Sequence, residues 1–159
     1  MTAQPAQQTG GRIRQVGKVV TTLIVTNRVD EALSARGSLA VDKVRSLSIT
    51  DVLVDTGATT LCLPIGLIRE LGLPLLRTMA VTTATGEEEL ELYQDAKIEL
   101  EGRSGTFECI ALPDGSAPLL GVVPLEMLGL EPDLQNQRLR VLPDSGHDTY
   151  MLAVSPRLY

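Results

Sequence analysis

The sequence of 159 residues has few aromatic residues, a single histidine and two cysteines. Its aromatic residues are three tyrosines and one phenylalanine, without tryptophan, which argues against a surface that stacks bases or sugars. His147, Cys62 and Cys109 are too few to supply the usual ligand set of a zinc site. No glycine-rich phosphate-binding loop is present either. We therefore expect neither a metal nor another cofactor.

Positive charge and long apolar runs are also scarce. The 14 Lys and Arg residues stand against 20 Asp and Glu residues, and the net charge of −6 makes nucleic acid an unexpected partner. No run is long enough to span a membrane, and the N-terminal residues lack the apolar centre of a secretion signal. Two widely separated cysteines do not make a disulfide framework. These absences predict a cytoplasmic protein with reduced, buried thiols and no membrane association.

The composition that remains fits one globular domain. Hydrophobic residues make up 43% and charged residues 21% of the chain, which is the balance of a soluble protein with a core. Residues 1–17 are rich in Gln, Thr, Pro, Ala and Gly, and we expect a flexible tail there. The pattern predicts one folded domain over 18–142 and a C-terminal tail over 143–159.

Many short β-prone stretches alternate with turns, which predicts a mainly-β barrel or sandwich. The expected strands cover 18–25, 39–41, 44–54, 78–83, 88–93, 96–101, 106–112, 119–123 and 138–142. The turn Ala84-Thr85-Gly86 joins two of them into a hairpin. One or two short helices begin at Pro64 and Pro124, with a further helical turn at 30–36. Each of the two ends at Leu-Gly-Leu, which indicates an internal duplication or a coincidence of common helix endings.

The segment that indicates chemistry is Asp55-Thr56-Gly57, directly after the apolar run Val52-Leu53-Val54. A carboxylate at the end of a buried strand must be held by something, because burying an unpaired charge is costly. Gly57 lets the chain turn sharply and brings backbone N–H groups close to the carboxylate. The simpler alternative is an Asx turn at a strand end.

These residues and their surroundings resemble the retropepsins, the retroviral-type aspartic proteases, and in particular their bacterial single-domain relatives. The similarity covers about residues 18–142. Its matching parts are Asp55-Thr56-Gly57-Ala58, the hairpin around Gly86, and the segment from Leu119-Leu120-Gly121 to the helix that ends at Gly129. The resemblance implies a closed acid-protease β-barrel, as a single retropepsin-like lobe. It also implies an aspartic endopeptidase that is active as a homodimer on peptide or protein substrates.

The same resemblance implies roles for individual residues. Asp55 would be the catalytic acid and base, Thr56 would hydrogen-bond to its twin across the dimer, and Gly57 would shape the loop. Ala58 would contact substrate beside them. The hairpin over 83–87 would be the flap, and its residues Ala84, Thr85 and Gly86 would also contact substrate. At Val122-Val123 the chain departs from viral enzymes, which often carry polar or charged residues there that brace the dimer.

Elementary chemistry agrees with a dimer. Hydrolysis of a peptide without a metal needs a base for water and an acid for the leaving amine, and two close carboxylates that share a proton supply both. One chain has one such loop, so a symmetric pair of chains would supply the second. Two alternatives stay open: a peptide-binding or dimerisation module without useful turnover, and a hydrolase that uses Ser145 and His147. The acidic run Glu87-Glu88-Glu89 is expected on a solvated strand, with Leu90 and Leu92 facing inward.

Overall fold

The structure is a computed structural model of the chain, and it describes residues 18–142. The predicted tails over 1–17 and 143–159, together with Ser145 and His147, lie outside the described residues. Within 18–142 the chain forms the strands β1 (Val20–Asn27), β2 (Ser46–Val54), β3 (Leu61–Pro64), β4 (Leu75–Thr83), β5 (Gly86–Leu100), β6 (Arg103–Leu112), β7 (Leu119–Leu120), β8 (Leu130–Asp133) and β9 (Arg138–Val141). The helices are α1 (Arg28–Ala35), α2 (Ile65–Leu71) and α3 (Val122–Leu128), with the 3₁₀ turn η1 (Val41–Lys43).

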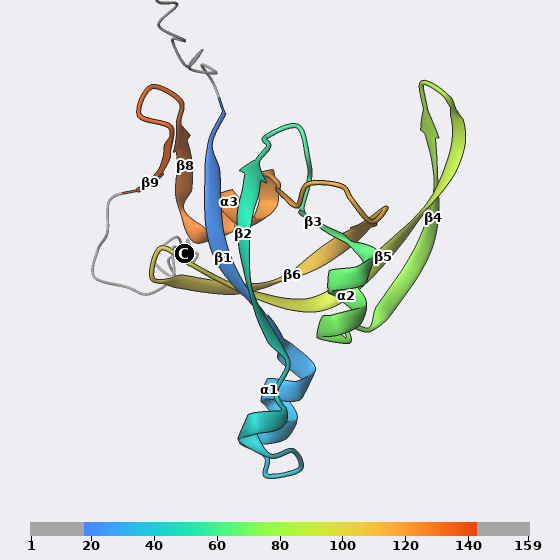
Figure 1. The fold of residues 1–159 in the computed structure, drawn as a ribbon, viewed down its shortest axis with the longest axis vertical. Helices are drawn as coiled ribbons and strands as arrows, with labels where there is room; N and C mark the ends of the chain where they lie inside the picture. The colour runs from blue at the N-terminus through green and yellow to red at the C-terminus, as the bar shows by residue number, and fades with distance from the viewer. Residues whose placement is uncertain (1–17, 143–159) are drawn as a thin grey trace, which may run out of the picture.

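The main sheet closes on itself into a barrel (Figure 1). Its strand order is β1-β2-β7-β3-β6-β5-β4, and an additional antiparallel pairing between β1 and β5 completes the ring. β4 lies outside this ring and pairs only with β5, as one arm of a long hairpin. The expected mainly-β fold with a closed barrel is confirmed, and the helical turn expected at 30–36 is a full helix, α1.

The pairing pattern has an internal symmetry. The elements β1, β2, β3 and α2 correspond in order to β5, β6, β7 and α3. Under this correspondence the antiparallel pair β1–β2 matches β5–β6, and the parallel pair β2–β7 matches β6–β3. The pairs β1–β5 and β3–β7 each join two corresponding strands. Both helices also end at a left-handed glycine, Gly72 with φ 63° and Gly129 with φ 64°. This is the arrangement that an internal duplication predicts.

The core fills the barrel with aliphatic side chains. Leu23, Val25, Val52, Leu61 and Leu63 are fully or almost fully buried on the first strands. Both helices add to this core, because α2 buries Ile68 and Leu71 while α3 buries Leu125 and Leu128. The two helices therefore cover the core at positions that correspond in the pseudo-symmetric halves.

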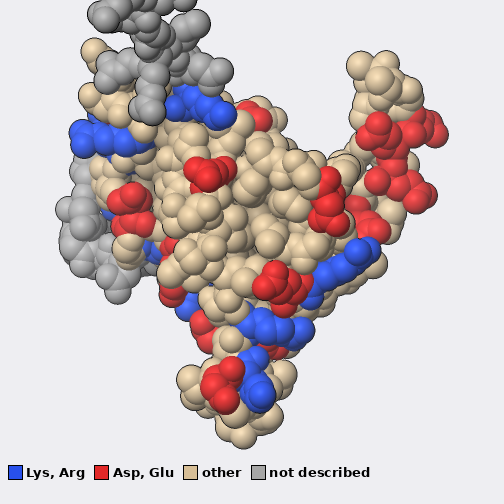
Figure 2. Space-filling view, in the orientation of Figure 1, with Lys and Arg blue, Asp and Glu red and all other residues tan. Residues whose placement is uncertain are grey.

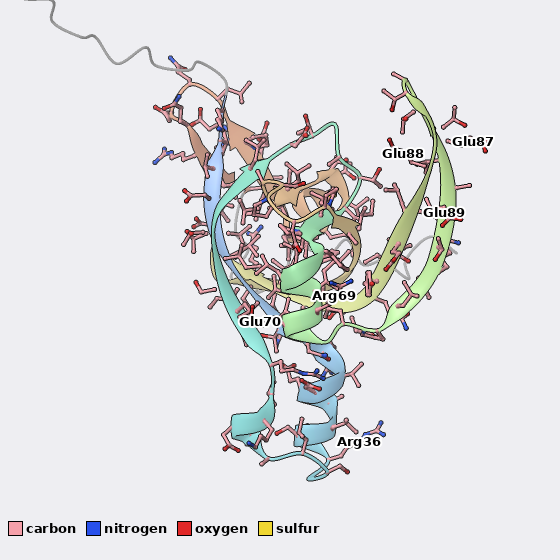
Figure 3. The ribbon with its side chains drawn as sticks, turned by 45° about the vertical axis from the view of Figure 1, so that its right-hand side comes forward. Arg36, Arg69, Glu70, Glu87, Glu88 and Glu89 are labelled. Atoms are coloured by element: carbon pink, nitrogen blue, oxygen red, sulfur yellow. The ribbon has the colours of Figure 1, made fainter. Side chains whose placement is uncertain are left out.

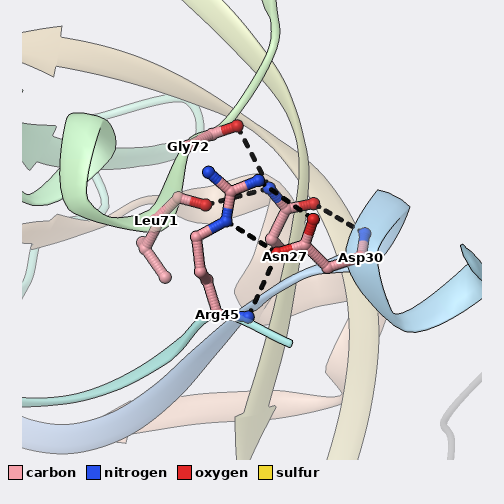
Figure 4. A network of polar contacts seen from close by, with 5 residues as sticks. All are labelled: Asn27, Asp30, Arg45, Leu71 and Gly72. Atoms are coloured by element: carbon pink, nitrogen blue, oxygen red, sulfur yellow. Dashed lines mark hydrogen bonds and ion pairs between the residues drawn. The ribbon is translucent and has the colours of Figure 1, made fainter. Parts of the chain in front are cut away.

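A small lobe formed by α1 and η1 extends from the barrel between β1 and β2 (Figure 1). Asn27 caps α1, since its Oδ1 accepts a hydrogen bond from the Asp30 N–H at 3.1 Å, and its Nδ2 donates to Leu71 O at 2.9 Å (Figure 4). The Arg45 guanidinium binds the buried Asp30 carboxylate, with Nε 2.7 Å from Oδ2 and Nη2 2.9 Å from Oδ1. These bonds hold the pKa of Asp30 below its ordinary value.

Three sequence-based expectations differ from the structure. The strand expected over 39–41 is wrong, because the chain turns through η1 there and brings Arg45 back to Asp30; Val41 is 82% exposed. The strand expected over 119–123 ends at Leu120, because Gly121 starts α3. β8 is not among the expected strands; it pairs with β9 to form a separate two-stranded sheet, in which the missing N–H of Pro132 is tolerated at a sheet edge.

Candidate active site

Asp55 directly follows β2, whose last two residues pair with β7 and whose only buried side chains are Ile49 and Val52. Leu53 and Val54 pair in parallel with Leu119 and Leu120, and the Asp55 N–H donates to Leu120 O at 3.0 Å. Val52, three residues earlier, is completely buried, whereas Asp55 is half-buried. The strand pairing thus fixes the backbone of Asp55, while the half-buried residue still reaches solvent.

The turn after Asp55 orients its side chain. The Gly57 N–H donates to Asp55 Oδ1 at 2.8 Å, and the Ala58 N–H donates to Asp55 O at 3.1 Å. A Cβ atom on Gly57 would lie only 3.1 Å from Asp55 Oδ1, so any larger residue at this position would crowd the carboxylate. Thr56 and Gly57 are exposed, and Ala58 is half-buried. Within 18–142, no ion pair involves Asp55.

The start of α3 fastens the other side of this loop. The Gly121 N–H donates to Thr60 O at 3.0 Å, the Val122 N–H to Ala58 O at 2.9 Å, and the Val123 N–H to Thr59 O at 2.9 Å. The first N–H groups of a helix have no partner inside the helix, and here loop carbonyls satisfy them. Gly121 packs so closely that a Cβ atom on it would lie 2.5 Å from Thr60 O. The role of Gly121 is not evident from the Leu119-Leu120-Gly121 motif alone, although a glycine between two leucines and the start of a helix is a signal for close packing.

One side chain that holds the loop, Thr60, was not singled out from the sequence, whereas Cys62 near it was expected to be buried. The buried Thr60 donates its hydroxyl to Glu108 O at 2.6 Å, which ties the loop to β6. Cys62 lies below the loop, where burial chiefly, and the nearby Asp55 charge secondarily, raise the pKa of its thiol to about 11. Burial also raises the pKa of the Cys109 thiol. Both cysteines are free and buried, as expected.

The hairpin of β4 and β5 carries the predicted flap residues at its tip. Ala84 and Thr85 form the turn, Thr83 pairs with Gly86, and the Thr83 hydroxyl donates to Gly86 O at 3.0 Å. Gly86 has φ +133°, a conformation that favours glycine. The tip is fully exposed and stands apart from the loop between β2 and β3 (Figures 1 and 3). The structure therefore groups Asp55, Thr56, Gly57 and Ala58 in one loop but does not bring Ala84, Thr85 and Gly86 against it.

The acidic run lies along this hairpin arm. Glu87, Glu88 and Glu89 follow the tip on β5 and are exposed (Figure 3), and the arm shows red carboxylates along its outer side (Figure 2). Leu90 is half-buried and Leu92 is buried, so the expected alternation is confirmed.

A cavity of about 480 Å³ lies between the hairpin arm, α3 and the loop after Asp55. Thr59 and Thr60 form its edge on the loop, although Asp55 itself is not part of the lining. The other walls are largely apolar and include Met79, Leu92 and Met127. We refer to this cavity as the β6 groove, because β6 forms its floor.

Other kinds of site were sought among residues 18–142. No group of His, Cys, Asp and Glu side chains there could hold a metal ion. None of the helices in this part of the chain is long and apolar enough to cross a membrane.

In this closed β-barrel, the Asp-Thr-Gly turn after β2 is bound to the start of α3, which follows Gly121. This arrangement defines a lobe of the aspartic protease type. The family model described as gag-polyprotein putative aspartyl protease matches residues 48–127, and the chain belongs to this family. This membership confirms the resemblance to retropepsin-like aspartic proteases.

Solved structures of two viral proteases are similar to the chain. The solution structure of simian foamy virus (mac) protease is 22% identical, covers 67% of this chain and 93% of its own, and has a TM-score of 0.42. EIAV protease complexed with the inhibitor HBY-793 is 18% identical, covers 73% of this chain and 90% of its own, and has a TM-score of 0.41. A comparison with curated proteins gave no match.

Proposed function

We propose that this chain is an aspartic endopeptidase that hydrolyses peptide bonds as a homodimer. The observation that carries the proposal is the fixed geometry of Asp55. Its backbone is bound by β7, and its Oδ1 atom accepts the Gly57 N–H at 2.8 Å. A carboxylate that is oriented by backbone groups and still reaches water can act on a water molecule.

A single carboxylate cannot be the base and the acid at the same moment. Two carboxylates held about 3 Å apart share one proton, so that one removes a proton from water while the other protonates the substrate. The described part of each chain presents one such loop, with Thr56 and Gly57 exposed beside Asp55. A second copy of the chain, related by a two-fold axis, would place the two Asp55 side chains and the two Thr56 hydroxyls face to face.

The substrate would be a peptide or a protein segment, with no cofactor. The exposed tip over 83–87 would act as a flap that closes on the bound peptide through Ala84, Thr85 and Gly86, while Ala58 contacts the peptide from below. A flap excludes water during the reaction and must open for substrate to enter. Its separation from the loop in the structure fits the open position of such a flap.

The test compares wild type with Asp55→Asn on a diverse peptide library, with cleavage read by mass spectrometry. The matched control is Asp42→Asn, an exposed carboxylate on η1. We expect Asp55→Asn to lose at least about 1,000-fold in kcat/KM, because an amide cannot accept the proton. Asp42→Asn should cleave like wild type, and both variants should sediment as dimers at micromolar concentration.

Mixed dimers sharpen the same test. A tagged wild-type chain combined with a tagged Asp55→Asn chain should give an inactive heterodimer, because each active site needs both carboxylates. Cleavage by well-folded Asp55→Asn protein, or full activity of a wild-type monomer in sedimentation, would refute the proposal. Peptide binding by wild type without any cleavage would instead favour the binding-module alternative.

A further inference from the structure

The helix α1 exposes apolar side chains and buries a charged one. A surface helix normally packs an apolar stripe against the core and turns its polar residues to water. In α1 the buried residue is Asp30, whereas Val29 and Leu33 are each 40% exposed. The hydrogen bonds of Asn27 and Asp30 attach the helix to its neighbours through its polar side. The apolar side of α1 is therefore left facing outward.

The lobe that carries α1 is an addition to the pseudo-symmetric barrel. Residues 28–45 connect β1 to β2, whereas the corresponding connection between β5 and β6 is the tight turn of Glu101 and Gly102. The second connection shows that the pairing of these strands needs no such lobe. The ion pair between Arg45 and the buried Asp30 nevertheless holds the lobe in one arrangement. An ordered addition that exposes apolar side chains is typical of an interaction surface.

A pocket of about 350 Å³ lies along the outer side of α1. We refer to its lining residues as the α1 stripe: Arg28, Val29, Ala32, Leu33, Arg36 and Asp95. Its apolar members lie three and four positions apart, so they share one face of the helix. Arg28 stands at one end of this face and Arg36 at the other. The stripe is therefore apolar at its centre and positively charged at both ends.

The two arginines are available to a partner. Arg36 is exposed, projects from the lobe (Figure 3), and makes no ion pair with any residue of 18–142. Arg28 lies 3.4 Å from Glu31, but Glu31 also binds Lys97 at 2.9 Å. Such exposed pairs are weak, so Arg28 can exchange its partner at little cost.

These charges decide which kind of partner fits. If two copies of α1 packed side by side, antiparallel helices would place Arg28 opposite Arg36, and parallel helices would place each arginine opposite its twin. Like charges that face each other disfavour the contact in both cases. A partner with a carboxylate at each end and apolar side chains between them is complementary to the stripe.

The α1 stripe lies far from the Asp55 loop. The lobe joins β2 at Ser46, and Asp55 follows the other end of that strand (Figure 1). The 9 residues of β2 at about 3.3 Å each separate the two by about 30 Å. The stripe shares no lining residue with the β6 groove. A partner bound at α1 therefore leaves the Asp55 loop free.

We propose that the α1 stripe is a docking surface for a segment of a partner protein that carries two large apolar residues flanked on both sides by Asp or Glu. The apolar residues cover Val29 and Leu33, and the carboxylates bind Arg28 and Arg36. The arginines are about 12 Å apart along the helix axis, which corresponds to acidic residues about eight positions apart in a helical segment or about four apart in an extended one. The docking does not depend on whether the chain is a protease.

The experiment selects displayed random peptides of about twelve residues on the immobilised full chain and measures each selected peptide by fluorescence anisotropy. We expect the selected peptides to share two large apolar residues between acidic ones. Leu33→Ser should weaken their binding about tenfold or more, because it removes an apolar contact at the centre of the stripe. Leu134→Ser is the matched control, since Leu134 is 54% exposed in the turn between β8 and β9, and it should bind like wild type.

A charge exchange tests the ends of the stripe. Arg36→Glu should weaken binding about three- to tenfold, because it places a carboxylate opposite an acidic residue of the peptide. A peptide in which that acidic residue is replaced by Lys should bind Arg36→Glu as the original peptide binds wild type. Arg36→Lys keeps the charge and should stay close to wild type.

Several results would overturn the proposal. They are the selection of no peptide, selected peptides without acidic residues, and binding that is unchanged in Leu33→Ser. Loss of self-association in Leu33→Ser but not in Leu134→Ser, measured by sedimentation, would make a second copy the occupant instead. A synthetic peptide of residues 143–159 contains Asp144 and Asp148 and serves as a competitor. If it binds the stripe more tightly than every selected peptide, the occupant is the chain's own C-terminal segment and not a partner protein.

Discussion

The closest backbone packing around the active-site loop is at Gly121, and Gly121→Ala is the smallest change that would disturb it. A Cβ atom there would lie 2.5 Å from Thr60 O, 2.6 Å from Ala58 O and 2.6 Å from Thr60 N. All three are backbone atoms, so no side chain can rotate away. Gly121 has φ −89°, which any residue adopts, and the effect of the substitution is therefore purely steric.

The magnitude follows from the distances. To lengthen the contact from 2.5 Å to the 3.4 Å of an ordinary contact, the loop must move by about 0.9 Å relative to α3. Overpacking of this kind costs about 1–3 kcal/mol, and a weakened Gly121–Thr60 hydrogen bond adds about 1 kcal/mol. A displacement of about 1 Å at a catalytic group lowers activity about 100-fold. We expect the free energy of unfolding to fall by about 2–4 kcal/mol and kcat/KM to fall about 100-fold.

Urea unfolding followed by circular dichroism measures the first quantity, and cleavage of one peptide substrate by the folded variant measures the second. Gly37→Ala is the control, because Gly37 has φ +78° and no atom lies within 4 Å of its Cβ position. That variant should lose about 1–2 kcal/mol from backbone strain but keep wild-type kcat/KM. Wild-type stability together with wild-type turnover in Gly121→Ala would refute the reasoning.

Two further predictions concern the α1 lobe and the hairpin tip. Asp30→Asn should lower the free energy of unfolding by about 1–3 kcal/mol at pH 7, because it breaks charged hydrogen bonds to Arg45. Because Arg45 lowers the folded pKa of Asp30, the difference from wild type should be complete above the ordinary Asp pKa of about 3.9. It should shrink below that pH and disappear as the pH falls through the lowered pKa of the folded state. Urea titrations at several pH values measure this, and a constant difference would contradict it. Gly86→Val should lower the melting temperature and also reduce kcat/KM, because φ +133° strains a β-branched residue and displaces the exposed tip, whereas Gly102→Val, at φ +73° in the open turn between β5 and β6, should lower the melting temperature but keep wild-type kcat/KM. Equal kcat/KM in the two variants would argue against a flap.

Sequence reasoning found the features that local residue patterns determine. The helix ends at Gly72 and Gly129 were predictable because each carries the left-handed conformation that glycine favours. The strand before Asp55 was predictable because an apolar run leads into a turn. In both cases the residues that determine the helix end or the strand lie within a few positions of it in the sequence.

Contacts between distant segments could not be predicted in this way. Arg103 lies between the strands expected over 96–101 and 106–112, but in the structure it starts β6 and its side chain is buried against the end of α3, where its Nη1 donates to Leu128 O at 2.7 Å and to Gly129 O at 3.0 Å. The bond between Thr60 and Glu108 joins residues 48 positions apart. β8 was missed, and only the pairing with β9 shows that Pro132, which lacks an N–H group, lies on an edge strand.

The parallel pairing of β2 with β7 has a consequence for how the molecule assembles. The Asp55 N–H donates to Leu120 O, and the Gly121 and Val122 N–H groups donate to Thr60 O and Ala58 O, so the loop is held by residues more than sixty positions further along the chain. Contacts of such large sequence separation form late in folding, because a long loop must first be closed. A growing polypeptide that has passed Asp55 but has not yet added α3 has no partner for the aspartate loop. The local bond from the Gly57 N–H can orient the Asp55 carboxylate earlier, but the backbone of the loop is held in place only after β7 and α3 have joined the barrel.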